Sequence, residues 1–356
     1  MKSQHLKECS VYFENEAFIA LNDHLVASQY SSIFIITDTI VHEHCLRILM
    51  QNISTDVPIE VIEIEAGEEN KNLSVCHEIW KTLSDLGADR KTLIINLGGG
   101  VVTDLGGFIA STFRRGIDFI HVPTSLLGMV DASLGGKNGV DLGHLKNQIG
   151  TIVLPKMVLV IPDFLKTLPT EEYRSGLAEM IKHGIIYNEK YFGYFEKLQD
   201  YDAAFLSQVI QDSIKIKLKI VASDPFENSH RKTLNFGHTL GHAIESYFLV
   251  DETKKRLLHG EAIAIGMILE SYLSAQKLQL SNKELNRITK AIVPVYKKVK
   301  FSKNDILEII QLLKYDKKNT GAQINFVLLN KIGDCAIDQQ VTNDEILNAF
   351  EFYANS

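Results

Sequence analysis

Residues 93–104 read LIINLGGGVVTD, an apolar run followed by three glycines and the start of a helix-like segment. In this order of strand, glycine loop and helix, backbone N–H groups and a helix N-terminus can bind a diphosphate. The dinucleotide fingerprint GxGxxG is incomplete, because Gly98 and Gly100 match while Thr103 stands in the place of the third glycine. The segment therefore predicts either a dinucleotide site or a plain tight turn, and by itself it does not separate the two.

Further apolar runs with strand character occur in the first half of the chain, at residues 33–36, 59–64, 117–122 and 158–161. Helix-like stretches such as residues 73–86 separate them, and this alternation is typical of a parallel sheet. From about residue 170 helical spacing takes over, and only the run 324–329 is strand-like. We therefore predict an α/β plus all-α protein, with a Rossmann-like nucleotide-binding domain over residues 1–168 and a helical domain over residues 169–356.

Composition and charge exclude several classes of protein. The 356 residues are 45% hydrophobic and 23% charged, which is too apolar for a disordered chain. No apolar run is long enough to cross a bilayer, and the start MKSQH lacks a secretory signal, so we expect a soluble, cytoplasmic protein. The net charge of −7 argues against nucleic acid or an anionic membrane as the main partner. The four scattered cysteines indicate a reducing compartment and no zinc ribbon.

Asp38 directly follows the strand-like run 33–36. An acidic side chain at this place can accept hydrogen bonds from the ribose hydroxyls of a dinucleotide. It can equally cap the N-terminus of the next helix, which is the commoner use of such a residue. Both interpretations stay open on the sequence alone.

Three histidines lie in two short segments that contain glycine. His238 and His242 are four residues apart in the run LNFGHTLGHAIE of residues 234–245, so a helix places both on one face, and His259 follows in LHGE. Glu179 is the best candidate for a carboxylate that completes a metal site. The alternative is that the histidines cap helices or form hydrogen bonds between domains. Spacing alone selects His238 and His242 together and does not say which histidine is not a ligand.

A basic, glycine-bearing stretch follows the glycine loop. Lys137, Lys146 and Asn147 lie within residues 131–147, which we interpret as a hydrophilic loop that can approach a substrate phosphate, with Arg115 as a further contact. The alternative is a solvated surface loop, because most lysines lie on the surface. The same alternative applies to Lys217, to Arg231 and to the residues 316–318.

The motifs occur together and in order, in the segments 98–105, 122–127, 130–133, 135–137, 146–147, 176–179 and 235–239. In this set the chain resembles the 3-dehydroquinate synthase family of sugar-phosphate cyclases, over about residues 38–318. The resemblance implies a fold similar to that of the metal-dependent polyol dehydrogenases, with an NAD-binding domain, a helical domain that binds metal and substrate, and an active site in the cleft between them.

The resemblance also implies an activity. Members of the family convert 3-deoxy-D-arabino-heptulosonate 7-phosphate to 3-dehydroquinate and phosphate, the second step of the shikimate route to aromatic amino acids. The reaction runs through transient oxidation by NAD, phosphate elimination, re-reduction, ring opening and aldol closure. The implied cofactors are NAD and one divalent metal, with zinc as the default and cobalt as the alternative. The implied assembly is a homodimer.

Site residues follow from the resemblance by motif. The metal ligands are Glu179, His238 and His259, which moves His242 to a role beside the bound substrate. Arg115 would reach the phosphate of a neighbouring subunit's substrate. The implied substrate contacts are Lys137, Asn147, Lys182, Lys217, Glu227, Arg231, Asn235 and Lys317. The implied cofactor contacts are Asp38, Glu68, Lys71, Gly99, Gly100, Val101, Val102, Thr103, Asp104, Thr124, Ser125, Asp131, Lys137, Lys146, Phe164, Leu165, Lys166 and Thr167.

Two other classes of protein share parts of this pattern. An NAD-dependent polyol dehydrogenase would have a similar fold and metal site, but it would have no need for the set Lys137, Lys146 and Arg231. A non-catalytic scaffold could keep the fold, although every expected ligand and cation is present here. The departures from the family pattern are Thr103, Ser125 and the run NGVD at residues 138–141.

Overall fold

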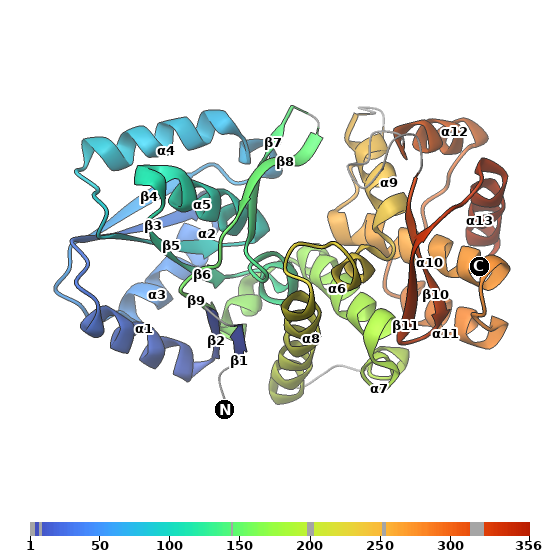
Figure 1. Cartoon of the computed structure of the whole chain (residues 1–356), viewed down its shortest axis with the longest axis horizontal. Coiled ribbons are helices and arrows are strands. Elements are labelled where there is room, and N and C mark those ends of the chain that lie inside the picture. Colours follow the sequence, from blue (N-terminus) through green and yellow to red (C-terminus); the bar gives the residue numbers. More distant parts are fainter. Residues whose placement is uncertain (1–3, 7–8, 144, 198–202, 251–253, 314–323) are drawn as a thin grey trace. The chain divides into compact units, whose positions relative to one another are not determined.

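The computed structural model of the chain describes residues 4–6, 9–143, 145–197, 203–250, 254–313 and 324–356 (Figure 1). The chain divides into two compact units, Met1–Tyr173 and Arg174–Ser356, and each is described by itself. The division lies a few residues beyond the predicted boundary at 168/169, within the helix α6 (Thr170–Tyr187). The division falls in the first turns of α6 because most of that helix belongs to the second unit.

The first unit is built on a seven-stranded sheet in the order β1-β2-β9-β6-β5-β3-β4. All neighbours pair in parallel except β1 with β2. The predicted runs at residues 33–36, 59–64, 93–95, 117–122 and 158–161 correspond to strands of this sheet, so the parallel α/β prediction is confirmed. The strands are β1 (Gln4–Leu6), β2 (Cys9–Phe13), β3 (Ser32–Asp38), β4 (Ile59–Ile64), β5 (Thr92–Gly98), β6 (Asp118–Pro123) and β9 (Met157–Val160).

Helices cover both faces of this sheet (Figure 1). The side chains of α4 and α5 form one apolar cluster with Phe34, Ile94 and Phe119 of the central strands. Because helices pack on both sides, β5 is buried along its whole length and is mostly apolar, with Thr92 and Asn96 as its polar residues. The helices are α1 (Asn15–Ala27), α2 (Thr39–Val41), α3 (Arg47–Asn52), α4 (Leu73–Asp85) and α5 (Gly100–Thr112).

The interpretation of residues 131–147 as an open loop is wrong for most of that stretch. Residues Lys137–Leu142 form β7, which pairs antiparallel with β8 (Leu145–Ile152) in a hairpin packed against α5. Gly139 and Gly150 lie opposite each other, and a Cβ on Gly150 would lie 2.3 Å from the carbonyl oxygen of Asn138. The glycines therefore permit close pairing of the strands, where their composition suggested a loop.

The second unit is mainly helical, as predicted, and its centre is α10, along which most side chains are buried. Helices α9, α11 and α13 and the strand β10 (Phe326–Lys331) pack on α10. The predicted strand at 324–329 is confirmed as β10, and its partner β11 (Asp334–Gln339) was not foreseen. The remaining helices are α6, α7 (Glu189–Phe192), α8 (Ala203–Ser223), α9 (His238–Val250), α10 (His259–Lys277), α11 (Asn282–Ile292), α12 (Lys303–Leu312) and α13 (Asn343–Asn355).

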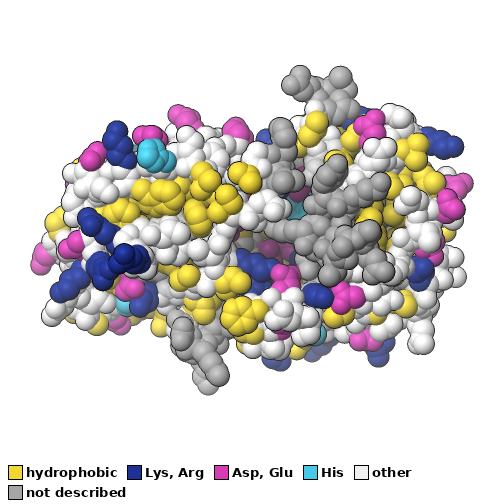
Figure 2. Space-filling view, turned by 45° about the horizontal axis from the view of Figure 1, so that its top comes forward, with side chains coloured by type: hydrophobic (Ala, Val, Ile, Leu, Met, Phe, Trp, Pro, Cys, Tyr) yellow, Lys and Arg dark blue, Asp and Glu magenta, His cyan; other side chains and the backbone are white. Residues whose placement is uncertain are grey.

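Within the described part of the chain, no helix combines the length and the apolar character that a membrane crossing requires. Figure 2 shows acidic side chains spread over the face in view rather than gathered in one patch.

The structure contains no disulfide among the four cysteines, and Cys9, Cys45 and Cys76 are buried. Cys335 is half-buried.

Candidate metal and cofactor site

The glycine loop joins the end of β5 to the start of α5. A Cβ on Gly98 would lie 2.5 Å from the Val102 side chain, and one on Gly100 would lie 3.3 Å from the Cβ of Ala132. Thr103 fits without a third glycine because its hydroxyl donates to the carbonyl oxygens of Gly99 (3.1 Å) and Gly100 (3.2 Å) inside the helix. The loop therefore leads closely packed backbone into a helix N-terminus, the arrangement that suits a diphosphate.

Lys71 joins this helix to the β7–β8 hairpin. Its buried ammonium donates to Asp104 Oδ2 at 2.5 Å and to Asn147 Oδ1 at 2.6 Å. The Asp141 N–H donates to the Lys71 carbonyl, and the Asn147 N–H donates to the Asp141 carboxylate. Burial by itself would lower the pKa of Lys71, but the charges of Asp104 and Glu68 outweigh it and hold this pKa above its usual value. Lys71 therefore carries its charge inside this cluster.

The remaining cofactor candidates lie around the carboxyl ends of β3, β5 and β6. The Thr124 N–H donates to the Gly98 carbonyl, and Ser125 Oγ accepts from the Gly128 N–H, which holds the turn after β6 beside the glycine loop. Asp131 lies half-buried in the turn Gly128–Ala132. Lys146 forms an ion pair with Glu68 at 3.4 Å. These residues share the edge of the sheet to which the glycine loop belongs.

Asp38 and Arg115 lie outside the hydrogen-bond cluster around Lys71. Asp38 accepts a hydrogen bond from the Val41 N–H at 2.9 Å and so caps α2, as the alternative interpretation predicted. Burial raises the pKa of Asp38 above its usual value. Arg115, which the resemblance places at a neighbouring subunit's substrate, is exposed after α5, roughly 20 Å along the helix from Gly100.

The turn Pro162–Thr167 follows β9 and supplies the last predicted cofactor contacts. Phe164 and Leu165 are buried, so their side chains belong to the core of the first unit. Lys166 is exposed and pairs with Asp163 at 3.0 Å. The backbone and the exposed side chains of this turn, rather than its two apolar side chains, are therefore what it offers to a ligand.

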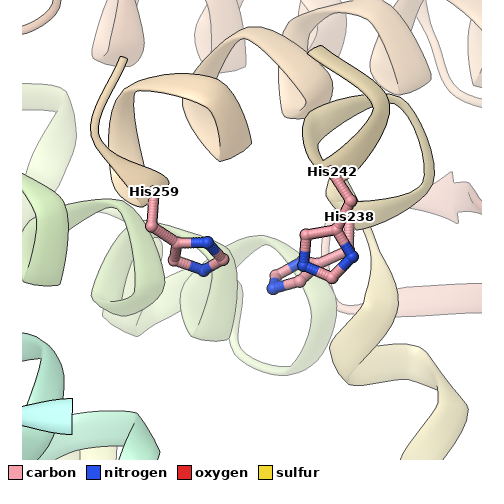
Figure 3. Close-up of side chains that lie close together, drawn as sticks. All are labelled: His238, His242 and His259. Carbon is pink, nitrogen blue, oxygen red and sulfur yellow. The ribbon is translucent and has the colours of Figure 1, made fainter. Parts of the chain in front are cut away.

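In the second unit, His238, His242 and His259 converge (Figure 3). Their nearest ring nitrogens lie within 4.8 Å of one another, and the ring centroids are 5.1 to 5.7 Å apart. His238 and His242 point from the first turns of α9, whereas His259 is the first residue of α10. The three imidazoles lie close enough to share one ion, and their spacing does not separate the predicted ligands His238 and His259 from His242.

Glu179 of α6 completes the cluster. Its Oε1 lies 3.5 Å from His238 Nε2 and 3.8 Å from His259 Nε2, and its Oε2 forms an ion pair with Lys182 one turn later. The carboxylate is fully buried, and among the described residues neither oxygen accepts a hydrogen bond of good geometry. The ion pair with Lys182 offsets part of the cost of burying this charge, and Oε1, which lies beside the two histidine rings, still lacks a hydrogen bond of good geometry. Within the described residues, this acceptor is the strongest sign of a cation site.

The tautomers of two histidines follow from what their other ring nitrogen contacts. His238 Nδ1 lies 3.1 Å from the Phe236 carbonyl oxygen, and His259 Nδ1 lies 3.2 Å from Glu245 Oε2. If Nδ1 carries the proton in each ring, Nε2 presents a lone pair toward Glu179. Glu245 is a residue that the sequence reasoning missed, although its place one turn after His242 was a usable signal.

The donor set fits a tetrahedral metal ion. Ligand bonds of 2.0 to 2.1 Å at tetrahedral angles separate neighbouring ligand atoms by about 3.3 Å. The distances from Glu179 Oε1 to the two Nε2 atoms are only slightly longer. Gly260 makes this approach possible, because a Cβ there would lie 2.3 Å from the Cα of Ser175, one helical turn before Glu179.

Among the described residues of the second unit, the buried lysine and arginine side chains are Lys182, Lys217 and Arg231. Arg231 donates from Nη1 to the Pro225 carbonyl at 2.6 Å. Asn235 donates from Nδ2 to Glu227 Oε1 at 2.9 Å, so these two predicted residues do lie together. Lys317 lies outside the described residues, and its predicted contact with substrate has no structural counterpart here.

Comparison with known proteins agrees with this geometry. The family profiles described as 3-dehydroquinate synthase N-terminal and C-terminal match residues 61–175 and 176–319. The chain is 40% identical to the 3-dehydroquinate synthase of Parabacteroides distasonis over 340 residues, 94% of this chain and 95% of the relative. The chain belongs to the 3-dehydroquinate synthase family. The Clostridium beijerinckii family member is 39% identical over 319 residues, 89% of each chain.

Solved structures show how widely the fold is shared. A 2-deoxy-scyllo-inosose synthase, solved with carbaglucose-6-phosphate, NAD⁺ and Co²⁺, superposes with a TM-score of 0.87 at 23% identity over 99% of each chain. The 2-epi-5-epi-valiolone synthase of Streptomyces hygroscopicus, solved with NAD⁺ and Zn²⁺, gives 0.82 at 26% identity, over 100% of this chain and 99% of that one. A probable glycerol dehydrogenase of Sinorhizobium meliloti gives 0.62 at 14% identity over 98% of each chain, which is a likeness of fold alone.

Proposed function

We propose that this member of the 3-dehydroquinate synthase family has the family's activity as a carbon–oxygen lyase. It would convert 3-deoxy-D-arabino-heptulosonate 7-phosphate to 3-dehydroquinate and inorganic phosphate. The observation that supports this best is the buried Glu179 carboxylate beside His238 and His259, in a chain whose sequence matches the family over most of its length.

We infer that Glu179, His238 and His259 hold one divalent ion, zinc by default with cobalt as the alternative, and that the first unit binds NAD. The two cyclase structures solved with NAD⁺ and Co²⁺ or Zn²⁺ support this inference. When bound, the metal would polarise substrate hydroxyl oxygens and NAD would accept and return a hydride. The predicted roles of 1–168 as cofactor domain and 169–356 as metal and substrate domain follow from this assignment.

The buried cations of the second unit would bind the anionic groups of the substrate. Lys182, Lys217 and Arg231 are shielded from water, and a charge-assisted hydrogen bond to phosphate or carboxylate is stronger there than on the surface. The backbone around Arg231 is held by Asp224, which accepts from its N–H at 3.0 Å. Glu227 would orient the amide of Asn235 toward substrate through the bond at 2.9 Å. His242 lies beside both histidine ligands and would contact a bound hydroxyl.

The first unit would hold the cofactor mainly through backbone. The N–H groups at the start of α5 would bind the diphosphate, and Lys71 with Asp104 would fix the neighbouring hairpin. Lys137 begins that hairpin and is exposed, and we propose that its ammonium contacts the ligand. Asp38, which caps α2 through its bond with the Val41 N–H, would also contact a ribose hydroxyl.

A homodimer in which Arg115 reaches the neighbouring subunit's substrate stays a prediction, as does a cytoplasmic location. Sedimentation of the purified protein would measure the first. Arg115 has a positive φ of 70° and follows Arg114, which also has a positive φ, so the backbone turns sharply after α5 and presents the side chain outward. A monomeric protein with full activity would contradict the role of Arg115.

The test is phosphate release from 3-deoxy-D-arabino-heptulosonate 7-phosphate, followed together with the absorbance of reduced nicotinamide. We expect release that requires both a divalent metal and catalytic NAD and leaves no net reduced cofactor. Sedoheptulose 7-phosphate and glucose 6-phosphate, the substrates of the sister cyclases, serve as controls. Release from either control but not from the heptulosonate would reassign the substrate, and net reduction of NAD by simple polyols would identify a dehydrogenase.

A further inference from the structure

Glu270 is a buried carboxylate of α10 that none of the proposed catalytic steps uses. It is charged and yet fully buried, because α10 is the central helix of the second unit. Its Oε2 accepts a hydrogen bond from the Gly237 N–H at 2.6 Å, and its Oε1 accepts one from the Leu240 N–H at 3.2 Å. Both donors belong to the turn that starts α9, the helix that carries His238 and His242.

These two bonds replace a missing helix cap. Gly237 is the N-cap of α9, since its carbonyl accepts the first helical bond from the Gly241 N–H at 3.0 Å. In a capping box, the N-cap side chain accepts from the third helical residue, whose own side chain reaches back to the N-cap N–H. Gly237 has no side chain and Leu240 has no polar group. One carboxylate from the neighbouring helix makes both bonds instead.

The close packing of α9 on α10 explains why the cap comes from another helix. Gly237 has a φ of 78°, and a Cβ there would lie 2.6 Å from the Met267 side chain. A Cβ on Gly266 would lie 2.0 Å from the Gly237 carbonyl oxygen. An ordinary N-cap serine or aspartate therefore cannot occupy position 237 without moving the helices apart.

This turn also sets the position of the first metal-ligand candidate. His238 is the first residue of α9, directly after Gly237, and its Nδ1 contacts the Phe236 carbonyl in the same turn. A movement of the turn would therefore displace His238 Nε2 from Glu179 Oε1 and from His259, which begins the helix that supplies Glu270.

We propose that Glu270 is a positioning residue for the metal site: by capping α9 from α10 it fixes His238 and His242 relative to His259. The inference rests on the proposed metal site. Loss of a group that hydrogen-bonds a metal ligand directly typically weakens metal binding 10- to 100-fold, and we expect the same range for Glu270, which acts through the turn that carries His238.

The test compares Glu270→Gln with Glu284→Gln in the full-length protein. Glutamine has one acceptor oxygen in its amide, so it keeps at most one of the two bonds. Glu284 is the matched control, because its carboxylate also accepts two backbone N–H groups, those of Ser281 and Ile332, at the start of a helix that carries no ligand. We measure Zn²⁺ affinity by competition with a chelator, and the visible absorption of the Co²⁺-substituted protein.

We expect E270Q to bind Zn²⁺ 10- to 100-fold more weakly and to change the Co²⁺ bands, while E284Q matches the wild type in both. Equal Zn²⁺ affinity and identical Co²⁺ bands in E270Q and wild type would overturn the inference and leave the metal site intact. A wild-type protein that binds neither ion would overturn the metal site itself, and the inference with it.

A second measurement needs no variant and covers the case in which E270Q does not fold. Binding and positioning are reciprocal, so Zn²⁺ should slow hydrogen exchange of the Gly237 and Leu240 amides in the wild type. The Ser281 and Ile332 amides at Glu284 should not respond. Exchange at Gly237 and Leu240 that is the same with and without Zn²⁺ would contradict the proposal.

Discussion

The glycine loop of the first unit and the histidine cluster of the second differ in how far their polar groups satisfy one another. Around the loop, Lys71 donates to both Asp104 and Asn147, and the Thr103 hydroxyl donates within its own helix. In the cluster, the described residues supply neither oxygen of Glu179 with a hydrogen bond of good geometry. Lys182 neutralises Oε2 of that carboxylate, so the first site is preorganised by the protein alone, whereas the second keeps Oε1 and the histidine nitrogens for a ligand.

The largest effect is expected at Glu179, whose Oε1 lies between the rings of His238 and His259. Glu179→Gln keeps the shape of the side chain but removes the charge that a divalent ion needs. We expect turnover to fall at least about 1,000-fold, or about 4 kcal/mol of barrier, together with a loss of bound metal. Glu171→Gln, an exposed position on the same helix, is the control and should change neither. Normal metal content in E179Q would refute the contrast between the two sites.

The preorganised site should respond through stability as well as binding. Lys71→Met removes a buried cation and leaves the Asp104 carboxylate without it, which should cost roughly 3 kcal/mol of unfolding free energy in the first unit. Urea unfolding followed by the fluorescence of Trp80 reports on this unit, because Trp80 is the only tryptophan and packs against Phe108. NAD should also bind more weakly, measured by titration. Lys81→Met on α4 is the exposed control. Equal unfolding free energies and equal NAD affinities in the two variants would show that the Lys71 cluster stabilises neither the fold nor the cofactor site.

A smaller effect is expected at His121, which is buried in β6 beside Asn96 of β5. Burial lowers the pKa of His121 to about 3, although its hydrogen bond with Asn138 raises it. The unfolded chain, with a pKa near 6.5 for this side chain, binds a proton below that pH that the folded protein does not, so stability is lost as pH falls. We expect about 2 kcal/mol of loss between pH 6.5 and pH 5.

The measurement compares Trp80-detected urea unfolding of the wild type with that of His121→Gln at these two pH values. The variant cannot take up the proton, so this part of the acid sensitivity should disappear. His77→Gln, at an exposed position of α4, should keep the wild-type dependence. An unchanged pH dependence in H121Q would show that His121 is not the group responsible.

The sequence predicted the elements whose signal is local. The apolar runs at residues 33–36 and 93–95 are buried strands, in which one side-chain type repeats over a few neighbouring residues. The run at 59–64, IEVIEI, is the edge strand β4, whose two glutamates are exposed. The β7–β8 hairpin was missed for the opposite reason. Its glycines Gly139 and Gly150 are a loop signal when read along the chain, and they are close-packed partners only when the two strands are paired.

The histidine cluster shows the same limit. Helical spacing brought His238 and His242 together without a structure, because residues four apart share one face of a helix. Spacing could not place His259 beside them, and the family resemblance supplied it. The structure adds the physical reason, since Gly260 lets the start of α10 lie against α6 near Glu179.

By itself the sequence determined the alternation of strands and helices, the glycine loop, the family and the candidate ligands, since these depend on neighbouring residues or on motifs in order. Tertiary structure alone decided which polar groups satisfy one another. Glu245 contacts a ring 14 residues away, Glu270 caps a helix whose first turn lies 33 residues before it, and Lys71 bonds to a side chain 76 residues later. Such pairs form only when the chain folds, because nothing in the local sequence of either partner specifies the other.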